Sequence, residues 1–181
     1  DHRGEKALLR QCFDESDRRL SVSYGVATVD ALRLALDRGT TALHISAHGI
    51  VDSTRGDMLL LEGVAGAAHP LSPADIFDLV SSAHRQRPRL VFLACCHSRA
   101  LGEAFLRAGV TFVVCIQRAE RVIDRASILF ARAFYNALAH EASVPDAFAA
   151  ARSRVATDAS LPDPAAEVRK FLLLSSVHSP A

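Results

Sequence analysis

Two side chains in this sequence could cooperate in acyl transfer: the imidazole of His48 and the thiol of Cys96. A cysteine is nucleophilic as its thiolate, and an imidazole within reach can take the thiol proton and later protonate a leaving amine. Backbone N–H groups must also hold the oxyanion of the tetrahedral intermediate. Gly49 offers such an amide, because a glycine has no side chain to keep a substrate away. The amide of Cys96 is the second candidate donor.

Both residues lie where apolar runs end. Residues 41–47 are predicted to form a strand that stops at His48, and residues 89–95 form a continuous apolar run typical of a central parallel strand. A helix is expected from about residue 98 to residue 107, and its N-terminus would favour a thiolate at Cys96. Because ligands of parallel sheets bind beyond the carboxyl ends of the strands, the two side chains are predicted to meet at one edge.

Strands and helices alternate along the rest of the chain. Thr28 and Ser72 are predicted N-caps of helices, whereas Pro162 and Pro164 are expected to break the chain. This alternation predicts an α/β fold with a mainly parallel central sheet and helices on both faces. The further expected elements are weak helix over 1–20, strands at 20–28, 58–62, 110–116 and 171–174, and helices at 29–37, 72–84, 123–140 and 144–157.

Length and charge limit the possible functions. The 181 residues fit one domain, so 1–181 is interpreted as a single domain. Because the chain begins at Asp1 without an initiator Met, it is expected to be a fragment of a larger multidomain protein. The net charge of +1 and the absence of Trp argue against a nucleic-acid or acidic-membrane surface. No signal peptide and no apolar run of roughly 20 residues is present, which predicts a cytoplasmic protein without membrane contact.

The four cysteines do not form a metal or redox motif. No C-x-x-C pair occurs, and a disulfide framework is improbable in a chain of this size. We therefore expect no metal and no cofactor. Period-2 alternation places Cys95 on the opposite side of its strand from Cys96, in the core, and Cys115 lies within another apolar strand. His44 is interpreted as a core histidine, and His97 as a residue at the edge of the pocket or a helix cap.

Three segments resemble the CHAT family of caspase-like cysteine peptidases, which belongs with caspases, metacaspases and separases. These segments are residues 42–49, 59–63 and 91–98, and the similarity extends over about 26–155. The His-then-Cys order, with a spacing of about 50 residues, is also that of caspases. The resemblance implies a caspase-like three-layer sandwich in which His48 is the base, Cys96 the nucleophile and Gly49 an oxyanion donor. It also implies a protein substrate and a partner domain of helical repeats.

The resemblance and the strand ends together suggest residues for substrate binding. Asp52 and Asp57 follow the His motif, with a solvated loop and a strand edge as the alternative. Gln117 and Glu120 follow the strand beyond Cys96, where caspase-like folds form part of the cleft; a charged surface loop is the alternative. Ala94 stands where metacaspases carry an Asp that binds a basic side chain, so a preference for Arg or Lys is not supported.

Two functions of different classes remain open at this stage. The first is a cysteine endopeptidase that cleaves a protein substrate through His48 and Cys96, in regulation or defence signalling. The second is a non-catalytic caspase-like interaction or regulatory module. The second is motivated by Ala94 and by His97-Ser98, since many CHAT members carry an acidic residue, Thr and Gly after the cysteine. A flavodoxin-like ligand binder would need a Gly-rich phosphate loop, which the sequence lacks.

Overall fold

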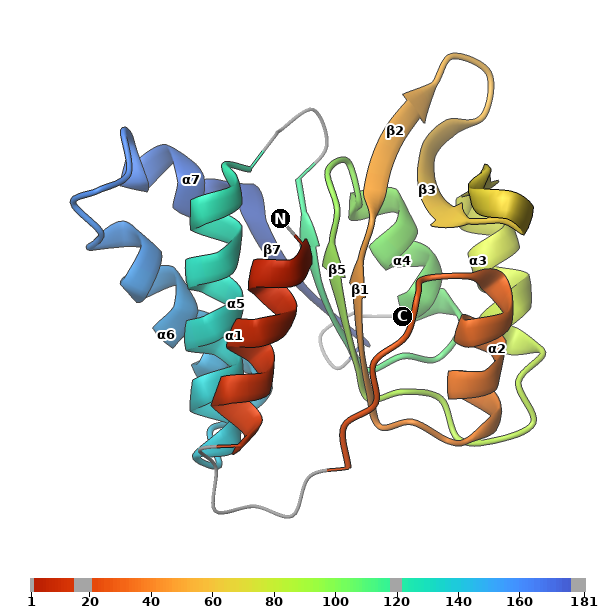
Figure 1. Cartoon of the computed structure of the whole chain (residues 1–181), viewed down its shortest axis with the longest axis horizontal. Coiled ribbons are helices and arrows are strands. Elements are labelled where there is room, and N and C mark those ends of the chain that lie inside the picture. The colour runs from red at the N-terminus through yellow and green to blue at the C-terminus, as the bar shows by residue number, and fades with distance from the viewer. Residues whose placement is uncertain (1, 15–20, 118–121, 177–181) are drawn as a thin grey trace. The chain divides into compact units, whose positions relative to one another are not determined.

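The structure is a computed structural model that describes residues 2–14, 21–117 and 122–176. These residues form two compact units, and Figure 1 shows their elements. One unit holds four helices: α1(His2–Asp14), α5(Asp124–Ala139), α6(Val144–Ala156) and α7(Pro164–Lys170). The other unit holds the remaining elements: α2(Val29–Asp37), β1(Ala42–Ser46), β2(His48–Asp52), β3(Gly56–Glu62), η1(Val64–Gly66), β4(Ala68–Leu71), α3(Pro73–Ser81), β5(Leu90–Ala94), α4(Arg99–Arg107), β6(Phe112–Ile116) and most of β7(Phe171–Ser175).

The central sheet of the second unit has four strands in the order β1-β5-β6-β7. β1 pairs with β5 in parallel, from Ala42 opposite Leu90 to Ser46 opposite Ala94, and β5 pairs with β6 in parallel. A smaller antiparallel sheet follows in the order β2-β3-β4. The predicted α/β class with a mainly parallel central sheet is therefore confirmed.

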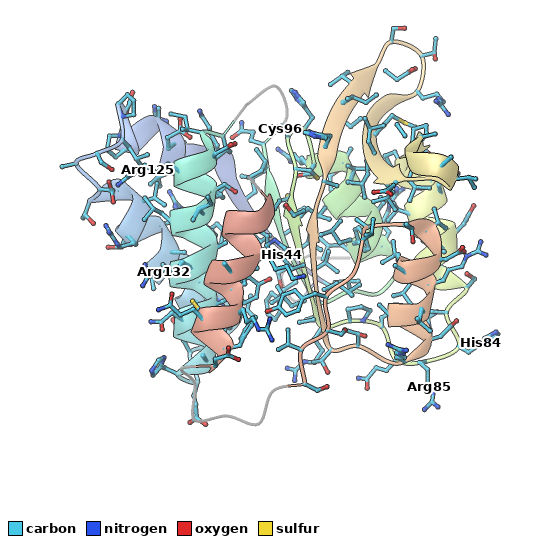
Figure 2. The ribbon with its side chains drawn as sticks, in the orientation of Figure 1. His44, His84, Arg85, Cys96, Arg125 and Arg132 are labelled. Atoms are coloured by element: carbon cyan, nitrogen blue, oxygen red, sulfur yellow. The ribbon has the colours of Figure 1, made fainter. Side chains whose placement is uncertain are left out.

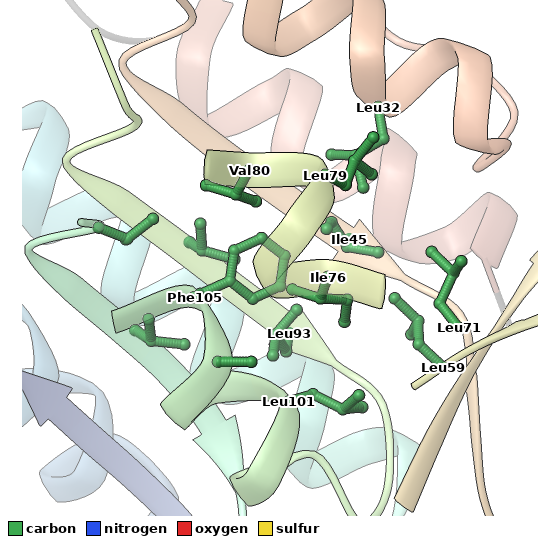
Figure 3. Packing of buried hydrophobic residues seen from close by; sticks show 14 of the residues in the cluster. Leu32, Ile45, Leu59, Leu71, Ile76, Leu79, Val80, Leu93, Leu101 and Phe105 are labelled. Carbon is green, nitrogen blue, oxygen red and sulfur yellow. The ribbon is translucent and has the colours of Figure 1, made fainter. Parts of the chain in front are cut away.

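A continuous apolar core joins the central sheet to α2, α3 and α4, which lie on one of its faces (Figure 1). The strands contribute Ile45 and Leu93, and the helices contribute buried side chains that meet them (Figure 3). The helix residues in this cluster are Leu32, Leu36, Ile76, Leu79, Val80, Leu101, Ala104 and Phe105. Burying a side chain of this kind stabilises the fold by about 1.5–3 kcal/mol relative to leaving it exposed. This core holds the carboxyl ends of β1 and β5 in place.

Local signals explain why the helices of this unit begin where they do. The Thr28 side chain accepts a hydrogen bond from the Ala31 N–H at 3.0 Å and caps α2. Ser72 and Asp75 form a reciprocal capping box at the start of α3. Both N-caps were predicted, and both satisfy helix N–H groups that have no partner within the helix.

The helical unit has an aromatic core of its own. Phe130 of α5 stacks on Phe171 with ring centroids 4.0 Å apart and meets Phe148 of α6 edge-on at 5.4 Å. On α1, Phe13 contacts Tyr135 at 5.5 Å. Aromatic pairs of this kind contribute about 0.5–1.5 kcal/mol beyond the area they bury. The division into two compact units does not decide whether residues 1–181 form a single domain, so the single domain remains a prediction.

Two sequence-based expectations are wrong. Residues 21–28 form no strand, and all of them except Ala27 and Thr28 are exposed; a backbone hydrogen bond links Ala27 O to the Glu62 N–H at 2.8 Å. Pro164 does not break the chain but begins α7, and the Asp163 side chain caps this helix by accepting from the Ala166 N–H at 2.9 Å. Proline is tolerated at the first helical position because that N–H has no partner within the helix.

Candidate active site

The strand register brings His48 and Cys96 to the same level of the sheet. β1 and β5 are parallel neighbours, and their last paired residues are Ser46 and Ala94. His48 and Cys96 each lie two residues beyond that pair. Figure 2 places Cys96 at the end of β5, where the hairpin of β2 and β3 begins. This is the edge at which parallel sheets bind ligands.

Gly49 is in direct contact with the backbone of Cys96. A Cβ atom built at Gly49 would lie 1.8 Å from the Cys96 carbonyl oxygen and 2.9 Å from the carbonyl carbon. Real Cβ atoms essentially never approach other atoms this closely, so any other residue at this position would push the two segments apart. The contact joins the residue that follows His48 to Cys96 itself, and it depends on the missing side chain.

A tight turn between β5 and α4 carries Cys96. The next residue, His97, has φ of +53°, in the left-handed region that non-glycine residues seldom adopt. Holding a residue there costs about 1–3 kcal/mol and persists when the surrounding structure enforces it. Such outliers cluster at functional sites. The turn leaves Cys96 half-buried.

Ser98 is a residue of this site whose role was not predicted from the sequence. Its side chain is fully buried, and its hydroxyl accepts a hydrogen bond from the Ile116 N–H of β6 at 2.8 Å. Ser98 is the N-cap residue of α4, yet its side chain makes no capping hydrogen bond. A serine at the start of a helix is normally interpreted as a cap, and the sequence carried no signal of the bond to β6. Ser98 therefore anchors the Cys96 turn to the neighbouring strand.

The four cysteines have different environments. Cys12, Cys95 and Cys115 are buried, whereas Cys96 is half-buried. Burial raises the pKa of Cys95 to about 12, although a hydrogen bond from Ser98 opposes the shift. Burial likewise raises the pKa of Cys115 to about 12. These two thiols stay protonated at neutral pH, as the core role predicted for them requires.

The histidines near the site also divide into two kinds. His48 is exposed at the first position of β2. His44 lies inside β1 and stacks on Phe92 of β5, with ring centroids 4.8 Å apart. The stacking agrees with the predicted packing role of His44. Of the two, His48 is the more exposed residue.

Asp52 lies at the far end of β2, about 13 Å from His48 at the usual 3.3 Å per residue. Its carboxylate accepts hydrogen bonds from the Thr54 hydroxyl, the Thr54 N–H and the Arg55 N–H at 2.7, 2.9 and 2.8 Å. The Thr54 hydroxyl in particular holds the pKa of Asp52 down to about 2. These bonds assign Asp52 to the hairpin turn.

The other residues predicted to bind substrate lie at different distances from Cys96. Ala94 ends β5 and is half-buried, and Gln117 is exposed directly after β6, at the same sheet edge. Asp57 is 5% exposed on β3, opposite Val51 of β2, and shares a strand face with Leu59, the partner of Gly49. Glu120 lies outside the described residues. Substrate binding by these residues remains a prediction.

The described residues contain no group of three or more His, Cys, Asp or Glu side chains arranged to hold a metal ion. Within the same ranges, no helix is both long enough and apolar enough to cross a membrane.

The mainly parallel α/β sheet, with Cys96 and His48 beyond the ends of two neighbouring strands, is consistent with a caspase-like fold. The family model of the CHAT domain matches residues 3–169, nearly the whole chain. The chain therefore belongs to the CHAT domain family, as its motifs suggested. No curated protein matches it significantly.

Proposed function

We propose that this chain is a cysteine endopeptidase in which His48 and Cys96 act as a catalytic dyad. The observation that carries the proposal is the contact of Gly49 with the Cys96 carbonyl, which holds the His48-Gly49 segment against the nucleophile turn. The parallel register of β1 and β5 and the partial exposure of Cys96 support the same assignment. Family membership supports a caspase-like peptidase or regulatory module.

The reaction divides into two steps. The imidazole of His48 takes the proton of the Cys96 thiol, and the thiolate adds to the scissile carbonyl carbon. The N–H groups of Gly49 and Cys96 hold the oxyanion. As the C–N bond breaks, the imidazolium of His48 gives its proton to the departing amine and leaves a thioester on Cys96. Water, deprotonated by His48, then attacks the thioester and releases the second product and the thiol.

The test is cleavage of a library of peptides from a digested proteome, with products identified by mass spectrometry. We expect Cys96→Ala to abolish cleavage and His48→Ala to reduce it by about 100-fold or more, the usual size of general acid–base catalysis. The matched control is Cys95→Ala, which removes the adjacent thiol and should keep cleavage. Equal cleavage by wild type and Cys96→Ala would refute the proposal.

The alternative is a non-catalytic regulatory module that retains the fold. Ala94 favours it, because no carboxylate stands two residues before Cys96 to bind a basic side chain. In that case wild type and Cys96→Ala would both leave the library intact. Binding of a partner protein would then depend on surfaces other than the dyad.

A further inference from the structure

The outer edge of β2 carries no other strand among the described residues. β2 is the end strand of the sheet β2-β3-β4, and its pairing runs from His48 opposite Leu60 to Asp52 opposite Gly56. The strand directly before it, β1, pairs with β5. Since only Ala47 separates β1 from β2, the side of the chain that faces β5 continues as the outer edge of β2. Figure 1 shows β5 and β3 on opposite sides of this continuous chain.

β5 stops below this edge. Its last residue is Ala94, and the chain then turns through Cys96 into α4. At the level of β2, no described strand continues the line of β5. The carbonyl of Cys96 lies at the foot of that line, in contact with Gly49 of β2. A strand added to the outer edge of β2 would therefore begin beside the nucleophile.

The side chains of β2 suit an incoming strand. Ile50 and Val51 are 40% and 50% exposed and, as neighbours on a strand, point to opposite faces of the sheet. Edge strands are usually protected from pairing by Lys, Pro or a bulge. β2 contains neither Lys nor Pro, and its ladder with β3 pairs five consecutive residues. Among the described residues no strand pairs with this edge, and β-branched side chains flank it on both faces.

We propose that the outer edge of β2 binds the polypeptide substrate as an added strand, in the position that a longer β5 would occupy. Backbone hydrogen bonds to β2 hold the segment extended, as in other cases of strand addition. Apolar substrate residues at alternate positions contact Ile50 on one face and Val51 on the other. The five residues of β2 span about 17 Å, which fits three to five substrate residues on one side of the scissile bond. The preferred substrate is accordingly an extended, apolar segment.

This inference rests on the proposed function and is tested with the same peptide library. The variants are Ile50→Lys and Val51→Lys, which place charge on the docking edge, and Ile50→Thr and Val51→Thr, which keep β-branching but remove apolar surface. Phe77→Lys is the matched control, because Phe77 is an apolar residue of similar exposure (37%) on α3. The rate at which iodoacetamide alkylates Cys96 reports separately on the thiol.

Wild type should prefer Val, Ile or Leu at alternate positions on one side of the cut. The Lys variants should cleave those peptides about tenfold more slowly, the effect of losing one or two favourable contacts, and the Thr variants should show a weaker preference. Alkylation of Cys96 and cleavage by Phe77→Lys should stay at the wild-type rates. Unchanged preference and rate in the Thr variants would overturn the inference while leaving the dyad intact. A wild type that cleaves nothing would refute the proposed function, and the inference with it.

Discussion

Cys95 and Cys96 are adjacent in the chain but have opposite environments. Cys95 is 5% exposed, and burial raises the pKa of its thiol to about 12. Cys96 is half-buried in the turn that follows β5, where its carbonyl meets Gly49. Both residues follow Ala94, the last residue of β5, and the chain turns as it passes from Cys95 to Cys96. Cys95, the first residue after β5, is buried in the core, whereas Cys96, one residue farther along the turn, keeps its side chain partly exposed.

The largest expected effect is that of Gly49→Ala, which would disturb the turn that holds Cys96, the partly exposed cysteine of the pair. The added methyl group would lie 1.8 Å from the Cys96 carbonyl oxygen, so the Cys96 turn must move. A displacement of about 1 Å at a reacting group can cost about 100-fold in rate. We expect a loss of at least that size in peptide cleavage. Gly25→Ala is the control, because no atom lies within 4 Å of a Cβ built there; equal rates in both variants would contradict the account.

Ser98→Ala should have the next largest effect, because Ser98 links the two environments. The substitution leaves the buried Ile116 N–H without the hydroxyl that accepts its bond, at a cost of about 1–3 kcal/mol in the free energy of unfolding. Cleavage should fall, but less than in Gly49→Ala. The control is Ser143→Ala, which removes the cap that accepts from the Asp146 N–H in α6, costs about 1 kcal/mol and leaves cleavage unchanged. If urea unfolding showed no loss in Ser98→Ala, the anchoring role would be wrong.

Measurements at alkaline pH test the buried thiols, those of Cys95 and Cys115. The pKa of both Cys95 and Cys115 is raised from 9.0 to about 12 in the folded state. Between those values the unfolded chain loses these protons and the native chain keeps them, so stability falls as pH rises. Each thiol contributes a slope of up to about 1.4 kcal/mol per pH unit. Between pH 8 and 11, urea unfolding should show that the free energy of unfolding declines less steeply in the double variant Cys95→Ala/Cys115→Ala than in wild type. An identical decline in the two proteins would contradict the assignment of Cys95 and Cys115 as buried, protonated thiols.

His97→Gly should have the smallest effect. Glycine adopts the positive φ of +53° without strain, which offsets the greater flexibility it gives the unfolded chain, so stability should change by less than about 1 kcal/mol. His97→Val cannot adopt this conformation cheaply and should cost about 1–3 kcal/mol. Thermal unfolding of the two variants distinguishes them. The opposite order would mean that His97 is held by contacts rather than by its backbone conformation.

Local signals made most of the fold predictable. Thr28 and Ser72 cap the helices they were predicted to cap, and the apolar run 89–95 became the central strand β5. β2 was missed because the five residues that follow the predicted end of the strand at 41–47 show little alternation of apolar and polar side chains. This strand is defined by its pairing with β3, which a single sequence does not show.

The site was also predictable in part: local sequence signals pointed to some of its residues, whereas contacts between distant residues did not show in the sequence. The residue types and spacing of His48, Gly49 and Cys96 suggested a shared strand edge, and the register of β1 and β5 brings them to the same level. The bond from Ile116 to Ser98 joins residues 18 apart in the chain. It depends on the packing of three elements, so the role of Ser98 could be recognised only in three dimensions.

The most direct test of the central claim is covalent labelling of the intact protein by a library of peptide acyloxymethyl ketones, followed by mass spectrometry. Wild type, His48→Ala and Cys96→Ala would be compared at neutral pH. The account predicts one adduct per chain, located on Cys96, slowed strongly in His48→Ala and absent in Cys96→Ala. Labelling of Cys96 that does not depend on His48, or no labelling of Cys96 in the folded wild type, would contradict it.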